Sequence, residues 1–266
     1  CEEQTVIAEM RYIVAPGACY QPEAIKAGKK LWGLSVQLYC LRSENNWGIG
    51  DFSDLAQLVT KAGKQGAGFI GLNPIHALYP SNPEACSPYG PSSRRWLNFL
   101  YIDVTALPEY NSAAVQAVVN AEEFQARLET ARSVEYVDYS LVTELKMAAL
   151  NSLFDEYYNA YLKKNSKQNR EFKAFIKAGG ESLVMQATYD AMQEYLQNDG
   201  KDAWGWPVFP ENWRDFHNEA VAKFAKKHKK RVQFYMFLQW QAAEQLEKAN
   251  QAAIAAGMPV GIYRDL

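Results

Sequence analysis

Two strand-length apolar runs with an amphipathic helix between them constrain the fold of this 266-residue chain most strongly. The runs are expected to be strands at residues 34–41 and 68–75. Between them, Asp51 is suited to cap a helix that begins at residue 54 or 55, and Gly66 is suited to end it. A strand, a helix and a strand in this order form a βαβ unit. The two strands are therefore predicted to be parallel neighbours.

The second half of the chain is dominated by helical periodicity, with no strand alternation between residues 113 and about 230. Helices are expected at 124–131, 140–162, 170–178, 181–197 and 215–228. A further helix over 232–256 and a terminal strand over 260–265 complete a second crossover. We therefore predict an α/β fold, namely the first three strands of a (β/α)8 TIM barrel with a large all-helical inserted subdomain. An open three-stranded parallel sheet is the alternative, which the need to cover both faces of a parallel sheet disfavours.

Four regions follow from this interpretation. Residues 1–30 are expected to be the end of a preceding N-terminal domain and a linker, with a short strand at 6–13. Residues 31–104 would hold barrel strands 1 and 2 with their site loops, 105–230 the inserted helices, and 231–266 barrel helix 2 and a truncated strand 3. Because the chain starts with Cys1 rather than Met and stops on an apolar run, we expect it to be a piece of a longer protein.

Composition argues against several classes of function. The net charge is −2, which disfavours a nucleic-acid surface or an anionic membrane as the main partner. The four cysteines are scattered without a CxxC spacing, so neither a metal site nor a disulfide framework is indicated. Reduced thiols and the lack of a signal peptide favour a cytoplasmic location. We expect no cofactor.

The stretch from residue 76 to 98 is the candidate for a binding site. It is rich in Pro, Ser and Asn, and Pro80, Pro83, Pro88 and Pro91 stiffen it into a shaped surface. Aromatic side chains stand beside hydroxyl and amide groups, a mixture that suits a polyhydroxylated ligand such as a sugar; the aromatic residues are Tyr79, Tyr89 and Trp96. A loop that follows a buried strand is where α/β barrels build their sites.

Three long segments carry a family resemblance: Leu31–Phe52, Gly71–Pro80 and Ser87–Asn98. They closely resemble the bacterial 4-α-glucanotransferases, also called amylomaltases or disproportionating enzymes, which form glycoside hydrolase family 77 of the α-amylase clan. The segment Phe234–Trp240 resembles the family's helix before the third strand. The resemblance implies a (β/α)8 barrel with helical insertions that transfers α-1,4-glucan segments between malto-oligosaccharides with retention, through a covalent glycosyl-enzyme.

The resemblance also implies which residues bind sugar. Ser87 and Tyr89 match the family's Ser-Pro-Tyr motif, and Asp265 matches the aspartate at the end of the third strand, beside the catalytic centre. Tyr39, His76 and Trp47 are further candidates for substrate binding, at the strand ends and in the first loop. The family's nucleophile and acid/base come from later strands, so we assign no catalytic residue here and expect this chain alone to be inactive.

Each of these residues also has a structural interpretation. Ser87 would form a turn, Tyr89 and His76 would pack, and Trp47 would act as a lid on the first loop. Trp204, Trp206 and Trp213 are expected to pack between helices rather than to form a glucan platform. The rival functions are an α-glucan hydrolase of the same clan and a non-catalytic glucan-binding or structural piece. Open strand edges would favour self-association.

Overall fold

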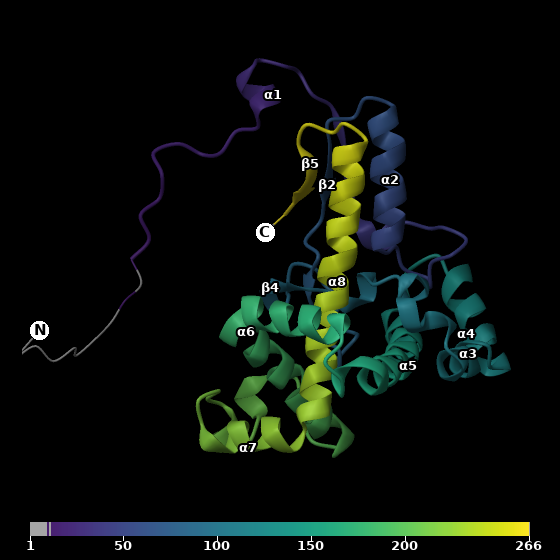
Figure 1. Ribbon diagram of the computed structural model, residues 1–266, viewed down its shortest axis with the longest axis vertical. Coiled ribbons are helices and arrows are strands. Elements are labelled where there is room, and N and C mark those ends of the chain that lie inside the picture. The colour runs from purple at the N-terminus through teal and green to yellow at the C-terminus, as the bar shows by residue number, and fades with distance from the viewer. Residues whose placement is uncertain (1–9, 11, 266) are drawn as a thin grey trace, which may run out of the picture.

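A three-stranded parallel sheet and a large helical block make up the part of the chain that the computed structural model describes, residues 10 and 12–265 (Figure 1). Of the strand expected at 6–13, residues 6–9 and 11 lie outside the described part, and the described positions of that segment are not in a strand. None of the described helices combines the length and the apolar character that crossing a membrane requires.

The sheet consists of β1 (Gly33–Val36), β2 (Phe69–Leu72) and β5 (Gly261–Arg264), paired in the order β1-β2-β5. Both pairs are parallel, with Ser35 opposite Gly71 and Gly71 opposite Tyr263. The predicted α/β fold with parallel neighbours is thus confirmed. Because the strands of a parallel sheet run in the same direction, the carboxyl ends of all three strands lie at the same end of the sheet.

The strands are shorter than predicted, and polar side chains and a proline account for this. After Val36, the chain turns into a 3₁₀ turn at Leu38–Cys40, because the side-chain Oδ1 of Asn73 accepts a hydrogen bond from the Leu38 backbone N–H at 2.9 Å. Strand β2 ends at Leu72, two residues before Pro74, which has no N–H to donate to a neighbouring strand.

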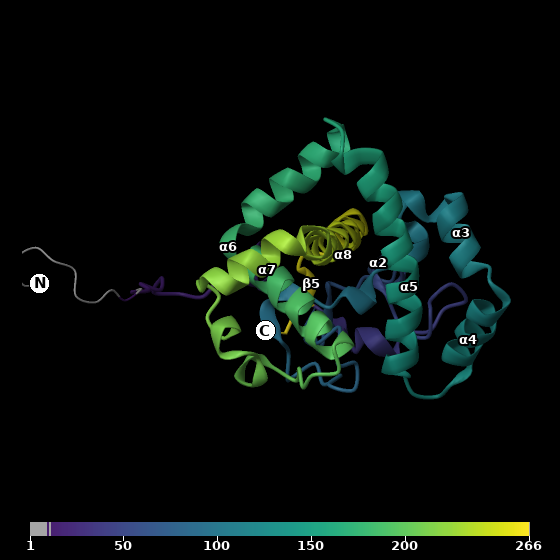
Figure 2. The same cartoon turned by 90° about the horizontal axis from the view of Figure 1, so that it is seen from below.

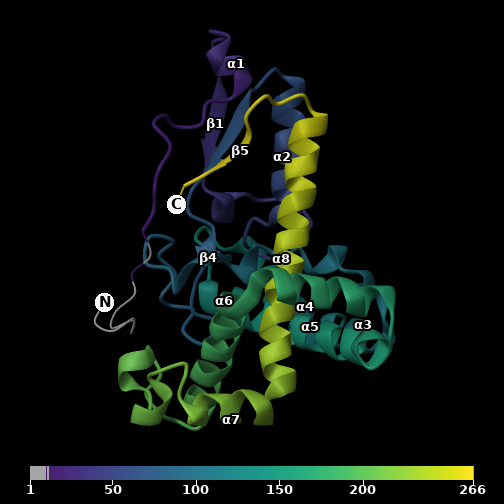
Figure 3. The same cartoon turned by 60° about the vertical axis from the view of Figure 1, so that its left-hand side comes forward.

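Helices α2 (Phe52–Lys64) and α8 (Lys229–Ala255) pack together on one face of this sheet (Figure 3). Asp51 caps α2 as predicted, since its carboxylate accepts from the backbone N–H groups of Ser53 and Asp54. After α2, Gly66 has a φ of 87°, the left-handed conformation in which glycine is favoured. On the opposite face of the sheet, Tyr263 is 61% exposed.

Helix α8 is shared between the sheet and the helical block. Its 27 residues extend about 40 Å at 1.5 Å per residue. In Figure 1 it runs from the sheet down into the helices below. Figure 2, seen from below, shows α5, α6 and α7 around it. Two buried glutamines on α8 pair with backbone groups of the segment that follows the loop, Gln239 with Leu97 and Gln245 with Asp103, by bonds of 2.8–2.9 Å.

The remaining helices have the following bounds: α1 (Glu23–Lys26), α3 (Ala113–Val119), α4 (Glu122–Ser133), α5 (Tyr139–Tyr157), α6 (Lys167–Asn198) and α7 (Glu219–Lys227). Helix α5 continues into a π-helical turn at Tyr158–Leu162, as expected for 140–162. The expected break at Gly179-Gly180 is present as a kink within α6, where Gly180 has φ 57° and ψ −151°. Helix α7 begins later than predicted because Asn218, not Asp215, caps it.

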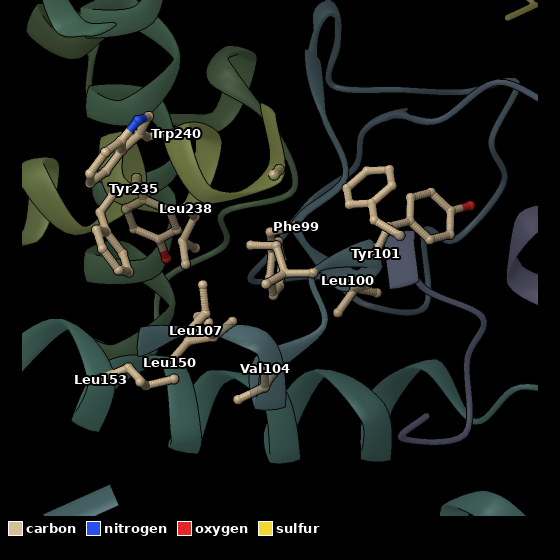
Figure 4. Close-up of a cluster of buried hydrophobic side chains, with 14 of the residues drawn as sticks. Phe99, Leu100, Tyr101, Val104, Leu107, Leu150, Leu153, Tyr235, Leu238 and Trp240 are labelled. Carbon is tan, nitrogen blue, oxygen red and sulfur yellow. The ribbon is translucent and has the colours of Figure 1, made fainter. Parts of the chain in front are cut away.

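The segment expected to be a loop contains a small antiparallel sheet. Strand β3 (His76–Ala77) pairs with β4 (Ser93–Leu97), and the Ser92 backbone N–H donates to the Ala77 carbonyl at 2.8 Å. The apolar run after it, 99–104, forms 3₁₀ turns capped by the side chains of Asn98 and Asp103. Apolar side chains of this run form a buried cluster with Leu107, with Leu150 of α5 and with Leu238 of α8 (Figure 4).

A buried lysine ties α5 to that same run. Lys146 is 1% exposed, and its Nζ donates to the carbonyls of Leu100 and Ile102 at 2.6 and 2.7 Å. Burial lowers the pKa of Lys146, and the nearby carboxylates of Asp51, Asp103 and Asp54 oppose this shift. Helix α5 is therefore joined to the 99–104 run by hydrogen bonds as well as by apolar packing.

Candidate functional site

A cleft of about 700 Å³ lies at the carboxyl ends of the three parallel strands. It is lined by Ser35, Val36, Gln37, Cys40, Leu41, Gly71, Leu72, Asn73, Tyr89, Tyr263 and Asp265. Ser35, Gly71 and Tyr263 lie side by side in the sheet, and a Cβ on Gly71 would lie 3.4 Å from the Ser35 Oγ and 3.7 Å from the Tyr263 ring. Glycine at this position keeps the floor of the cleft low between two larger side chains.

Backbone and side-chain hydrogen bonds fix the three strand ends relative to one another. The Asn73 backbone N–H donates to the Val36 carbonyl at 3.3 Å, while its side chain holds the turn after β1. The Asp265 backbone N–H donates to the Leu72 carbonyl at 3.3 Å. As a result Gln37, Asn73 and Asp265, which are far apart in the sequence, line one cleft.

The loop between β3 and β4 supplies the wall of the cleft with Tyr89. This side chain is 69% exposed. Three contacts hold the loop in place. The Gly90 N–H donates to the Ser87 carbonyl at 3.1 Å, the Ser92 hydroxyl to the Leu78 carbonyl at 2.8 Å, and the Ser140 hydroxyl of α5 to the Glu84 carboxylate.

Two titratable side chains beside the cleft have shifted pKa values. The pKa of Tyr39 is raised, first by burial and then by the neighbouring Cys40, Tyr89 and Cys86, so its phenol stays a neutral donor. The pKa of His76 is lowered, first by burial and then by the positive charges of Arg94 and Arg264, while Asp265 opposes the change. A neutral imidazole is therefore favoured at pH 7, and its buried Nε2 has no hydrogen-bond partner among the described residues.

The structure brings together most of the residues that the sequence singled out. Tyr89 and Asp265 line the cleft, Tyr39 lies close enough to Tyr89 for Tyr89 to contribute to its raised pKa, and His76 lies close to Asp265. Ser87 is exposed in the turn two residues before Tyr89 and does not line the cleft in this arrangement of the loop.

Trp47 requires a correction. It is only 4% exposed, and its ring packs edge-on against Phe124 of α4 at a centroid distance of 5.4 Å. An indole buried in this way offers neither a sugar platform nor a lid, because the first loop folds back onto the helical block: Arg132 of α4 donates to the Asn46 carbonyl at 2.7 Å.

Sequence reasoning missed three cleft residues, Ser35, Asn73 and Tyr263. Each interrupts an apolar strand run with a polar group, and Asn73 also stands directly before a proline. A polar side chain at alternate positions of a strand expected to be buried on both faces was the available signal. The assembled cleft offers hydroxyl and amide groups, two exposed tyrosines and, among the described residues that line it, the single carboxylate of Asp265.

Comparisons with known proteins agree with this architecture. A family model described as 4-alpha-glucanotransferase matches residues 36–266. A 4-alpha-glucanotransferase of Haemophilus influenzae is 38% identical over 261 residues, which are 97% of this chain and 37% of that protein. A 4-alpha-glucanotransferase of Mycobacterium tuberculosis is 34% identical over 271 residues, or 97% of this chain and 35% of that protein.

Solved structures show the same likeness. The crystal structure of amylomaltase from Corynebacterium glutamicum has a TM-score of 0.70 and 28% identity, and the match covers 92% of this chain and 31% of that one. Amylomaltase from Streptococcus agalactiae in complex with acarbose has a TM-score of 0.64 at 17% identity, over 90% and 43% of the two chains, and shares the fold. The chain belongs to the 4-α-glucanotransferase family. It spans 37% and 35% of the two curated relatives named above.

Proposed function

We propose that this chain forms the first three strands of the catalytic (β/α)8 barrel of a 4-α-glucanotransferase, with the helices between α3 and α7 as an inserted subdomain. The strand order supports this, because each strand is added beside the previous one and both crossover helices, α2 and α8, pack on the same face. A doubly wound sheet would carry helices on both faces. The bare face that includes Ser35 and Tyr263 then becomes the barrel interior.

The proposed reaction is the transfer of an α-1,4-glucan segment from one malto-oligosaccharide to the 4-hydroxyl of another, with retention through a covalent glycosyl-enzyme. Within it, Tyr89 provides an apolar face for a glucose ring, and Asn73 and Asp265 supply hydrogen bonds to sugar hydroxyls. Ser87 and His76 support the same subsite from the loop and from beneath Asp265. The polarity and the exposed aromatic surface of the cleft support these roles.

One observation supports a proposal about what this chain can do alone. Retention requires two carboxyl groups about 5–5.5 Å apart, one as the nucleophile and one as the acid/base. Asp265 is the single carboxylate among the described residues that line the cleft. We therefore propose that the 266-residue chain is inactive alone, and that the catalytic pair belongs to a longer protein.

Incubation with maltotriose tests the activity. We expect no glucose and no longer maltodextrins from the purified 266-residue chain, whereas a longer protein that contains it should produce both. Transfer by the chain alone would refute the proposed inactivity. Net release of reducing ends by the longer protein would instead identify a hydrolase.

Titration with maltoheptaose tests the cleft. Tyr89→Ala should weaken binding about 2- to 10-fold, since an aromatic contact contributes about 0.5–1.5 kcal/mol. Tyr136→Ala is the matched control, because Tyr136 is 80% exposed and does not line the cleft. Equal affinities for the two variants would remove Tyr89 from the site.

Self-association is part of the same proposal. Strands β1 and β5 are the outer strands of the sheet; Leu34 in β1 and Trp32 just before it are 40% and 49% exposed. Unpaired strand edges with exposed apolar side chains pair readily with other chains. Light scattering should show a mass above the 30.1 kDa of the monomer that rises with concentration. A constant monomer mass up to millimolar concentration would contradict it.

A further inference from the structure

A second and larger pocket, of about 830 Å³, lies in the helical block and shares no lining residue with the cleft at the strand ends. Its walls come from β4 and the loop before it, from the middle of α6, and from the segment 204–216 that joins α6 to α7. That segment is the light green connection in Figure 2. The pocket volume lies within the usual range for small-molecule sites, about 300–1,000 Å³.

The kink in α6 shapes this pocket. At Gly180 the backbone adopts φ 57° and ψ −151°, a conformation open to glycine, so the helix bends away after Gly179. Gly179 lets β4 approach, because a Cβ there would lie 3.1 Å from the Trp96 ring. The Trp96 indole N–H then donates to the Ser182 carbonyl and hydroxyl at 3.2 Å. These contacts hold the hairpin wall against the helix wall.

The aromatic side chains of the segment 204–216 divide into packed and exposed ones. Trp213 packs as predicted, with its ring 4.9 Å from that of Phe224 and 6.0 Å from that of Tyr195. Trp213 and Trp206 both line the pocket, but Trp206 remains 60% exposed. The prediction that all three tryptophans pack between helices is therefore wrong for Trp206, and for Trp204, which is 55% exposed but does not line the pocket.

Polar groups in the pocket wall are fixed by their own hydrogen bonds. Gln186 is 9% exposed, and its Nε2 donates to the Ser92 hydroxyl at 3.4 Å and to the Asp190 carboxyl at 3.0 Å. This fixes the amide orientation, and its Oε1 accepts no hydrogen bond from another side chain or backbone group in the described part of the chain. Ser93 and Tyr79 add hydroxyl groups nearby.

Among the described residues that line the pocket, Arg95 and Arg214 are basic and Glu181 is acidic, which leaves an excess of one positive charge. Arg214 also donates its Nε proton to the Phe209 carbonyl at 2.9 Å, which holds its side chain along the wall. The charged groups of the lining therefore disfavour a cationic ligand. Fixed amide and hydroxyl groups beside exposed aromatic faces instead suit a neutral ligand with many hydroxyl groups.

We propose that this pocket is a second carbohydrate-binding site, which holds an α-1,4-glucan apart from the cleft at the strand ends. The choice of an α-glucan over other sugars rests on the proposed function. Trp206 stacks on the face of a glucose ring, and the Gln186 carbonyl and the hydroxyl groups of Ser93 and Tyr79 bind sugar hydroxyls. A site of this kind keeps a long glucan attached to the protein while one of its ends lies in the cleft.

Calorimetric titration of the 266-residue chain with maltoheptaose tests the pocket, with every variant made in a Tyr89→Ala background to weaken the cleft. Binding should persist in Tyr89→Ala and fall at least five-fold when Trp206→Ala is added. Trp204→Ala is the matched control: an equally exposed tryptophan two residues away, outside the pocket, whose removal should leave the affinity within two-fold. Because Trp206 is largely exposed, its loss should leave the thermal unfolding midpoint unchanged.

Three outcomes would overturn the proposal: no binding in the Tyr89→Ala chain, equal affinity with and without Trp206, or equal losses in the Trp204 and Trp206 variants. These outcomes differ from the result expected if the cleft binds no glucan. In that case, adding Tyr89→Ala to the Trp206→Ala chain would leave the affinity for maltoheptaose unchanged. As a check on the ligand class, cellohexaose should bind at least five-fold more weakly than maltoheptaose. Equal affinity for the two would overturn the assignment to α-glucans.

Discussion

Replacing the buried Asp190 by asparagine should change how the stability of this protein depends on pH. Asp190 lies on α6 and is 4% exposed, and its Oδ1 accepts a hydrogen bond from Gln186. Burial raises the pKa of Asp190 to about 8; the Gln186 bond opposes the shift, and the nearby Glu194 adds to it. An asparagine keeps the Oδ1 acceptor and has no proton to lose, so it resembles the neutral carboxyl in shape and charge.

The size of the effect follows from proton linkage. An aspartate in an unfolded chain ionises near pH 3.9, whereas folded Asp190 keeps its proton up to about pH 8. Between these values the folded state binds one more proton than the unfolded state, so stability falls by about 1.4 kcal/mol for each pH unit. Over the whole window the loss is on the order of 5 kcal/mol, and below pH 4 it vanishes because both states are protonated.

Urea unfolding of the wild type and of Asp190→Asn at pH 5, 6, 7 and 8 measures this directly. The free energy of unfolding of the variant, relative to that of the wild type, should rise by about 4 kcal/mol between pH 5 and pH 8, because every other titrating group contributes equally to both proteins. Asp202→Asn, at an exposed position, serves as the control and should follow the wild type. A difference between the wild type and Asp190→Asn that changes by less than about 1 kcal/mol across this range would show that Asp190 is ionised in the folded state, and the argument would fail.

Two further substitutions test how the helical block is held together. Lys146→Met should destabilise the protein by about 3–5 kcal/mol in urea unfolding, because it leaves the carbonyls of Leu100 and Ile102 unpaired and removes a buried positive charge. Burial raises the pKa of Asp51 to about 6, and the charge of Lys146 opposes this shift, so the substitution should raise the pKa of Asp51 further in an NMR titration. A loss of unfolding free energy below about 1 kcal/mol would contradict the role assigned to Lys146. Gly180→Ala should lower the free energy of unfolding by about 1–3 kcal/mol, because Gly180 has a positive φ. At the control position Gly17 the surrounding space is open and φ is not positive, so Gly17→Ala should change the free energy of unfolding by less than about 0.5 kcal/mol. Equal effects at both glycines would refute the strained conformation at Gly180.

Local patterns predicted the elements of the fold well, and long-range contacts explain what they missed. The cap at Asp51 and the kink at Gly180 are determined by residues close in sequence, and both were predictable. The early end of β1 was not, because it depends on a bond from Leu38 to Asn73, 35 residues away. The hairpin of β3 and β4 was missed for a similar reason: glutamines of α8, 142 residues from Leu97 and Asp103, fix the chain that follows it.

The candidate site shows the same division. Tyr89 and Asp265 were identified because a family motif contains them, and the resemblance carried no information about burial. Trp47 was therefore misassigned, since its burial depends on Phe124 in a helix that lies more than seventy residues further along the chain. Trp206 was misassigned in the opposite direction, because composition alone does not show which tryptophans of a segment find a packing partner.

The open face of the sheet connects the fold with the proposed function. A parallel sheet is stable when apolar layers cover both of its faces, and in this sheet α2 and α8 pack on one face. On the uncovered side stand Ser35, Gly71 and Tyr263, which combine small size, polarity and an exposed ring instead of the branched apolar side chains of a buried layer. Such a surface suits the upper rim of a barrel interior, where substrate rather than side chains fills the space. The same residues that leave the sheet uncovered in this chain therefore become, in the proposed barrel, the floor on which a glucan would lie.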